Sequence, residues 1–187
     1  SLLVVISAVL TYLTAGGSTD WFSLFKLTFG GMFITATANT LNQILERDTD
    51  SLMKRTLNRP LPASRLSVGQ AFGLAALSGI TGFLLLYLIN PLSAVLGLLS
   101  MGLYAFVYTP MKRKSSFAVF IGAFPGALPV LIGWTAAVNE FSLFSWLLFL
   151  IQFVWQFPHF WAIAWVLDED YQKAGFRLLP SQGGRDQ

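Results

Sequence analysis

Three polar side chains near the end of an apolar segment have the types and the spacing of a metal site. Asn42, Glu46 and Asp50 stand four residues apart, so on a helix they form a stripe along one face. Asp48 points away from that stripe. Carboxylates near a helix C-terminus oppose the helix dipole, and a divalent cation would compensate for them. Because Mg²⁺ prefers one or two carboxylates together with phosphate oxygens and water, the stripe predicts a magnesium site for a phosphorylated substrate.

The same carboxylates also have a plainer interpretation, which is a solvated helix end. They could pair there with Arg47, Lys54 and Arg55, and exposed ion pairs of this kind are common and weak. Asn42 argues against this interpretation, because it lies deeper within the apolar segment.

Two groups of cations could bind a diphosphate. Arg55 and Arg59 lie four residues apart and are followed by prolines, and arginine binds phosphate through a bidentate fork. Lys112, Arg113 and Lys114 close another apolar segment, where they would neutralise a leaving diphosphate. Attraction to anionic lipid headgroups and a role as topological anchors are the alternatives.

The single histidine of the chain is the last candidate. His159 precedes Asp168 by nine residues, which places it about 13 Å below that acidic end at about 1.5 Å of helix rise per residue. Ionisable groups at such a depth in a membrane usually have a function. A flat apolar pocket beside it could be lined by Trp155, Phe157, Phe160 and Trp161. The alternatives are a histidine bonded to a neighbouring helix and tryptophans that face lipid.

The elements that must position these residues are apolar helices. Of 187 residues, 55% are hydrophobic and only 11% are charged, against about a quarter charged in soluble domains. The mean hydropathy is +0.62. These values exclude a disordered chain, a coiled coil and an ordinary cytosolic domain, and they indicate an all-α, polytopic membrane protein. The absence of cysteine excludes a disulfide scaffold and thiolate metal sites.

Six segments are candidates to span the membrane as helices of about 20 residues. They lie at about 2–15, 21–45, 67–89, 91–108, 117–138 and 141–167. The first is short, and we expect that its beginning is missing; a signal-peptide core is the alternative.

The charges favour one topology, because 11 of the 12 Lys and Arg residues follow the second, fourth and sixth segments. The positive-inside rule makes that side cytoplasmic, or the matrix side in a mitochondrion.

Three motifs together resemble the UbiA-type intramembrane prenyltransferases. The first motif combines the Asn42, Glu46 and Asp50 stripe with a following Arg-Thr-x-x-Arg-Pro-Leu stretch that begins at Arg55. The second is Tyr-Thr-Pro-Met-Lys-Arg over residues 108–113. The third, Trp-Gln-Phe-Pro-His-Phe-Trp over residues 155–161, is followed by Asp168-Glu-Asp170-Tyr171. It is similar to the branch of the superfamily that farnesylates haem b. The resemblance covers essentially the whole chain.

The resemblance implies one intramembrane prenyltransferase domain of nine helices, of which residues 1–187 hold six. We therefore expect that the last helices and the extreme N-terminus are missing. It implies transfer of a farnesyl group from farnesyl diphosphate to a vinyl group of haem b, giving haem O for terminal oxidases. A haem A synthase would act downstream, and no nucleic acid is involved. The implied location is the lipid bilayer of the bacterial inner membrane with a cytoplasmic active site, or the mitochondrial inner membrane in a eukaryote.

The resemblance also assigns roles to the candidate residues. Mg²⁺ would be bound by the stripe of Asn42, Glu46 and Asp50, which with Lys112 form the catalytic set. The diphosphate would be bound by Arg55, Arg59, Lys112 and Arg113. Haem would contact His159, Trp155 and Trp161, and neutral imidazole suits its iron. Asp168 and Asp170 are candidates for a second metal site, although they are two residues apart and do not share a helix face.

Two rival functions stay open. A prenyltransferase of the same superfamily could act on an aromatic quinone precursor, although His159 and its aromatic neighbours favour haem. A membrane transporter is the rival from another class, since transporters carry ionisable residues near the membrane midplane. The clustering of charge on one side of the membrane favours chemistry at the surface instead.

Overall fold

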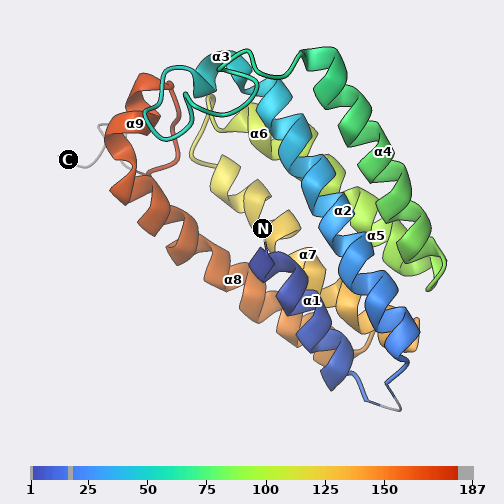
Figure 1. Ribbon diagram of the computed structural model, residues 1–187. Coiled ribbons are helices and arrows are strands. Elements are labelled where there is room, and N and C mark those ends of the chain that lie inside the picture. The colour runs from blue at the N-terminus through green and yellow to red at the C-terminus, as the bar shows by residue number, and fades with distance from the viewer. Residues whose placement is uncertain (1, 17–18, 181–187) are drawn as a thin grey trace.

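The computed structural model describes residues 2–16 and 19–180, and every regular element among them is a helix. Figure 1 shows the long helices side by side, with the short elements gathered at one end. The elements are α1 (Leu2–Thr14), α2 (Trp21–Leu45), α3 (Arg47–Asp50), α4 (Val68–Tyr87), α5 (Pro91–Gly102), the π-helix η1 (Leu103–Tyr108), α6 (Thr109–Met111), α7 (Ala118–Val138), α8 (Leu143–Val166) and α9 (Asp168–Lys173).

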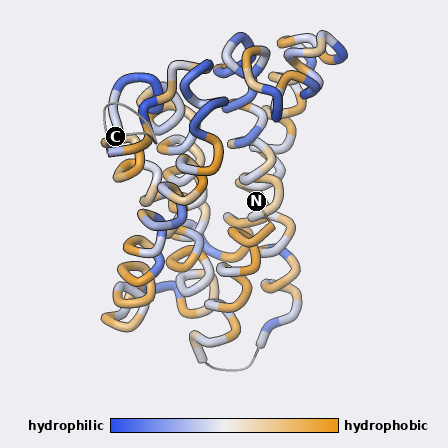
Figure 2. The backbone as a smooth tube through the Cα atoms, turned by 90° about the vertical axis from the view of Figure 1, so that its left-hand side faces the viewer, coloured by the Kyte–Doolittle hydropathy of each residue, from blue (hydrophilic) through white to orange (hydrophobic). Residues whose placement is uncertain are grey.

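The six predicted segments are confirmed as helices. α5, η1 and α6 follow one another without a break and form one apolar rod over Pro91–Met111. Within the described residues, four helices are long and apolar enough to cross a membrane, namely this rod and α4, α7 and α8. Figure 2 shows hydrophobic residues along the helices and a concentration of hydrophilic residues at the end that carries α3 and α9.

Side-chain caps define the starts of several helices. Asp20 caps α2 by accepting from the backbone N–H groups of residues 22 and 23. Ser67 forms a capping box with Gln70 at the start of α4. Asn90 caps α5, whose first residue is a proline, so a tight turn joins α4 to α5. These caps satisfy backbone groups that would otherwise lie unpaired near lipid.

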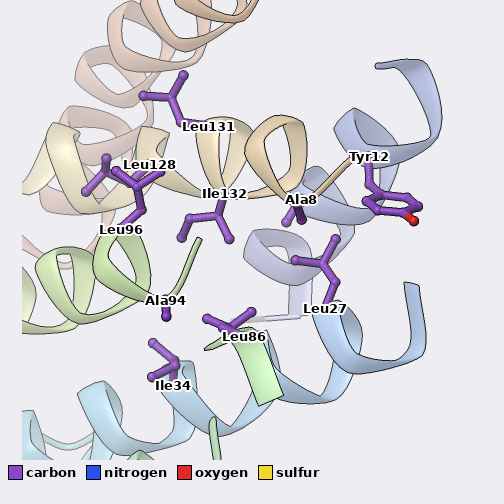
Figure 3. Close-up of a cluster of buried hydrophobic side chains, with 11 residues drawn as sticks. Ala8, Tyr12, Leu27, Ile34, Leu86, Ala94, Leu96, Leu128, Leu131 and Ile132 are labelled. Carbon is purple, nitrogen blue, oxygen red and sulfur yellow. The ribbon is translucent and has the colours of Figure 1, made fainter. Parts of the chain in front are cut away.

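The centre of the described bundle is α7, which packs against α1, α5 and α8 and is the most buried of the four long apolar helices. Figure 3 shows the apolar cluster where α7 meets α1, α2, α4 and α5. Small residues let the backbones approach closely. At Gly82 a Cβ atom would lie 2.9 Å from the backbone nitrogen of Ile34, and at Gly133 the backbone of Ala8 leaves no room for one.

The π-helix η1 was not predicted. It interrupts the rod over Leu103–Tyr108, just before the second motif. π-helical turns are rare and are frequent at functional sites. Here the turn carries Tyr104 and Tyr108, whose rings lie 5.5 Å apart between centroids.

Candidate active site

Charged residues from distant parts of the chain meet in one cavity of about 210 Å³. The cavity lies where α2, the loop after α3, the end of the π-helical rod and the segment around α9 come together. Its polar and charged lining residues are Asn42, Glu46, Asp50, Arg55, Arg59, Tyr104, Tyr108, Lys112 and Tyr171. The structure therefore brings together the predicted metal stripe and three of the four predicted diphosphate-binding cations.

The stripe lies across a break in the helix. α2 ends at Leu45, and Glu46 leaves the helical conformation with φ −102° and ψ 10°. The amide of Asp50 nevertheless donates to the carbonyl of Glu46 at 2.7 Å, which keeps both carboxylates on the same side. Relative exposure is 7% for Asn42, 5% for Glu46 and 1% for Asp50. The Asp48 side chain is 88% exposed and pairs with its neighbour Arg47, so it faces away as predicted.

Glu46 pairs with Lys112. Lys112 Nζ lies 2.7 Å from Glu46 Oε1 and donates a hydrogen bond to Oε2 at 2.8 Å. Burial lowers the pKa of Lys112, although the Glu46 carboxylate acts in the opposite direction. The same Nζ lies 5.1 Å from the ring centroids of both Tyr108 and Phe176. The lysine is therefore a buried cation held by one carboxylate and two aromatic faces.

Asp50 pairs with Arg59. Arg59 Nη1 lies 2.7 Å from Asp50 Oδ2, and the hydroxyl of Thr56 donates to the Asp50 carbonyl at 2.8 Å. The solvated-helix-end interpretation is therefore wrong, because both carboxylates are buried and their partners are Arg59 and Lys112. Arg55 lines the cavity, and its amide donates to Asp170 Oδ2 at 3.4 Å, which ties the loop to α9.

Residues after α9 complete the wall. The amide of Arg177 donates to the carbonyl of Lys112 at 2.7 Å, so the chain that follows α9 runs across the end of the rod. Phe176 and Leu178 line the cavity there, and burial raises the pKa of Tyr171. The hydroxyl of Tyr171 therefore stays protonated near neutral pH.

Arg113 lies elsewhere than its neighbour Lys112. It lines a larger cavity of about 750 Å³, together with Lys114, Asp168 and Arg177. The two predicted acids of the second metal site also separate. Asp168 faces this larger cavity and accepts from Gln172 at 2.9 Å, whereas Asp170 contacts Lys173 and the amide of residue 55.

The predicted haem-binding residues lie outside the 210 Å³ cavity. The side chains of Trp155, His159 and Trp161 are exposed on the surface of α8, because no described residue covers them. His159 makes no hydrogen bond to another helix within the described part of the chain, so the interpretation of a histidine bonded to a neighbouring helix is not supported. Phe160 connects the two regions, because its ring lies 5.8 Å from that of His159 and it also lines the cavity.

The donor set of the cavity fits Mg²⁺. An amide and two carboxylates match a cation that prefers oxygen ligands and few carboxylates. Glu46 Oε1 is buried and accepts no well-aligned hydrogen bond from the described residues, although Lys112 Nζ is close to it. Across residues 2–16 and 19–180, no group of three or more His, Cys, Asp or Glu side chains could hold a metal ion. A metal at Glu46 and Asp50 would therefore need the Asn42 amide and oxygens from a substrate.

Sequence reasoning missed several residues of the site. Tyr104 and Phe176 line the cavity as aromatic walls, and Thr109 bonds to Asn42 across 67 residues of sequence. Tyr108 and Thr109 lay in a motif whose cations alone received a role. Only the motif itself could have indicated them, because no local spacing links the rod to α2.

The family model and the curated relatives that match this chain point to the same family. The UbiA prenyltransferase family model matches residues 2–187. A relative from Flavobacterium psychrophilum, named protoheme IX farnesyltransferase, is 53% identical over 163 residues, which are 87% of this chain and 54% of the relative. A relative of the same name from Cytophaga hutchinsonii is 51% identical over 184 residues, which are 97% of this chain and 64% of the relative. The chain thus spans just over half to just under two thirds of these relatives.

A solved structure has the same fold. The structure of a UbiA homolog from Archaeoglobus fulgidus bound to DMAPP and Mg²⁺ superposes with a TM-score of 0.82 at 18% identity. The match covers 99% of this chain and 66% of that chain. At this identity the likeness establishes the arrangement of the helices.

Proposed function

The chain belongs to the UbiA prenyltransferase family, and from that premise we propose that it transfers the farnesyl group of farnesyl diphosphate to a vinyl group of haem b. The product would be haem O. With its apolar helices and this family membership, the chain is an integral membrane protein. One observation carries the proposal, namely the buried cavity at the polar end of the bundle that joins Asn42, Glu46 and Asp50 to Arg59 and Lys112. The names of the two relatives support haem as the acceptor.

Asn42, Glu46 and Asp50 would hold Mg²⁺ in this cavity, and the bound ion would neutralise charge on the diphosphate as it leaves. The Archaeoglobus homolog binds Mg²⁺ together with DMAPP, which supports the use of Mg²⁺ with a prenyl diphosphate. We propose one metal site only, because Asp168 and Asp170 face different surroundings.

The cations of the cavity would stabilise the leaving diphosphate. Arg59 and Lys112 neutralise Asp50 and Glu46 in this structure. Once those carboxylates bind the metal, both cations can donate to phosphate oxygens, and Arg55 lines the same cavity. Arg113 would add positive charge from the neighbouring cavity.

Aromatic walls would protect the reacting allylic carbon. Tyr104, Tyr108, Phe160 and Phe176 surround the charged groups of the cavity. Their faces attract cationic charge, and their bulk excludes water that would quench an allylic cation. The farnesyl tail would lie along the apolar helices beyond them.

For the acceptor, we propose that haem b lies against the face of α8 that carries His159 and Trp155. Trp155 and His159 are four residues apart and share a helix face. Trp161 follows His159 by about half a helical turn, so it points toward the other side of the helix. Phe160 joins this face to the cavity. His159 is the candidate to contact the porphyrin or its iron.

The membrane side and the partners follow from the same proposal. Basic residues concentrate after the even-numbered spans, which supports a site on the cytoplasmic side of a bacterial inner membrane, or on the matrix side in a mitochondrion. The product would serve terminal oxidases, directly or through a haem A synthase.

An assay with purified protein, labelled farnesyl diphosphate, haem b and Mg²⁺ tests this function. Because the chain spans 54% and 64% of the two relatives, the assay needs a version extended to their length. We expect a product with the mass of haem O that disappears when EDTA removes the metal. Prenylation of 4-hydroxybenzoate in place of haem would support the quinone-type rival, and transport without product would support the transporter.

A further inference from the structure

We propose that Thr109 is a positioning residue, which orients the amide of Asn42 so that its oxygen is available to the metal. This inference rests on the proposed function, because it assigns Asn42 as a metal ligand. Thr109 lies at the start of α6 and is almost completely buried. It is not a member of the predicted site.

The direction of the hydrogen bonds at Thr109 is determined. Its hydroxyl donates to the carbonyl of Tyr104 at 2.8 Å, which uses the only proton that a hydroxyl has. Thr109 Oγ1 must therefore act as the acceptor in its 3.0 Å contact with Nδ2 of Asn42. The nitrogen of the amide is thus on the side of Thr109.

The second proton of that nitrogen is also used. Asn42 Nδ2 donates to Glu46 Oε2 at 2.8 Å. Asn42 Oδ1 accepts no hydrogen bond from any residue that the structure describes, and Asn42 lines the cavity. A flipped amide would instead place its oxygen against a carboxylate and against a hydroxyl that has no proton left to donate.

Thr109 differs from Glu46 in what happens when a metal binds. Glu46 is itself a proposed ligand, so its oxygens would be drawn to the cation and its hold on Asn42 would weaken. The Thr109 hydroxyl is anchored to a backbone carbonyl and has no such second role. It therefore can keep the amide in place in both states, as partners of metal ligands commonly do.

The π-helix explains why Thr109 reaches Asn42. Both the backbone N–H and the hydroxyl of Thr109 donate to the carbonyl of Tyr104, five residues earlier. An α-helix would pair that carbonyl with the N–H four residues on, and each residue of register turns the helix by about 100°. The π-helical turn thus sets the direction in which Thr109 faces α2.

A metal titration separates this role from simple helix packing. Mn²⁺, which is visible by electron paramagnetic resonance, replaces Mg²⁺ in the purified protein in nanodiscs with inorganic pyrophosphate present. Thr109→Val keeps the shape and removes the hydroxyl, and we expect about a 10–100-fold loss of Mn²⁺ affinity. Thr109→Ser restores the hydroxyl and should bind Mn²⁺ nearly as the unmodified protein does.

Thr37→Val is the matched control. Thr37 is a buried threonine of α2 whose hydroxyl lies 2.9 Å from Phe33 O and 3.2 Å from Ala75 O of α4, away from the cavity, and can donate its one proton to either. We expect this variant to lower the melting temperature without changing Mn²⁺ affinity.

Three results would overturn the inference. Unchanged Mn²⁺ affinity in Thr109→Val would remove the positioning role. Equal losses in Thr109→Val and Thr109→Ser would show that packing alone matters. Failure of the unmodified protein to bind Mn²⁺ would remove the metal site altogether. The expected pattern of affinities without any haem O product would instead contradict the proposed function and leave the positioning role standing.

Discussion

At the scale of single residues, the site is a balanced set of buried charges. Glu46 and Asp50 are each neutralised by one cation, Lys112 and Arg59 respectively. Buried pairs of this kind contribute little net stability, but loss of one partner leaves an uncompensated charge that costs about 3–5 kcal/mol. The effect of a substitution therefore depends on the partner that it leaves behind.

The first prediction separates the metal stripe from a diffuse acidic surface. Asp50→Asn keeps the size of the side chain and removes the charge. We expect farnesyl transfer to fall by orders of magnitude, because several kcal/mol of charge stabilisation by the metal would be lost. Asp48→Asn is the control, since Asp48 is exposed and outside the cavity. Equal losses of activity in the two variants would contradict a metal role for Asp50.

The second prediction separates stability from chemistry at Glu46. Lys112 Nζ lies 2.7 Å from Glu46 Oε1, so Glu46→Gln leaves the buried ammonium without its carboxylate partner. We expect a loss of about 3–5 kcal/mol in the free energy of unfolding. The double variant Glu46→Gln with Lys112→Met should recover most of that stability, although it should stay inactive. Chemical unfolding followed by tryptophan fluorescence measures the first quantity, and no recovery in the double variant would contradict the pairing.

At the scale of elements, apolar length and composition were enough to predict the six apolar helical segments. Apolar length and the proline after Asn90 define their ends, and these signals are local in sequence. The π-helix η1 has no such signal, because its register depends on contacts such as that between Thr109 and Asn42. The ion pairs of the stripe with Arg59 and Lys112 were missed for the same reason, although both cations were placed in the predicted site. Lys112 lies 66 residues from Glu46, and spacing along one helix cannot reveal a pairing between two.

The third prediction concerns the contact between α2 and α4. At Gly82 an added Cβ would lie 2.9 Å from the backbone nitrogen of Ile34 and 3.0 Å from the carbonyl oxygen of Gly30. Backbone atoms can move aside only if the helix itself shifts, which costs packing energy. Gly82→Ala should therefore lower the melting temperature. Gly73→Ala on the same helix is the control, because no atom lies within 4 Å of its Cβ position. There alanine should be neutral or stabilising, since it favours a helix by about 1 kcal/mol over glycine. Equal effects at both positions would contradict the close packing.

At the scale of the whole molecule, the ends of the bundle differ in charge. Both candidate cavities lie at the end that carries α3 and α9, where Figure 2 shows the hydrophilic residues. Among the described residues, the turns at the opposite end hold only Asp20 and Glu140 as charged side chains, and Lys26 near the start of α2 donates to the carbonyl of Leu88 there. This asymmetry is what a fixed orientation in the membrane requires.

The fourth prediction tests that orientation by labelling. The sequence contains no cysteine, so single cysteines can be introduced without background. Cysteines at Ser51, after α3, and at Ser115, after α6, should react with a membrane-impermeant thiol reagent from the same side. A cysteine at Asn139, after α7, should react only from the other side. Labelling of Ser51 and Ser115 from opposite sides would contradict the number of spans between them.

The last prediction concerns how haem reaches the site. The structure places His159 on the exposed surface of α8, where it bonds to no other helix among the described residues. Its loss should therefore disturb the fold little. If His159 contacts haem, His159→Ala should weaken haem binding by about tenfold or more, since one contact of about 1.4 kcal/mol has that effect. Farnesyl diphosphate binding should stay nearly unchanged, because His159 does not line the charged cavity.

Spectroscopy and a control on the same helix complete that test. The haem absorption band should shift in His159→Ala if the imidazole ligates iron. Leu150→Ala, an exposed apolar position of α8, should leave both binding constants unchanged. Loss of affinity for both substrates together with a lower melting temperature would mean that His159 supports the fold. Unchanged haem binding and an unchanged spectrum in a stable variant would remove His159 from the site. Haem recognition would then have to come from the walls of the cavities, where Arg113, Lys114 and Arg177 line the larger cavity and could pair with the haem propionates.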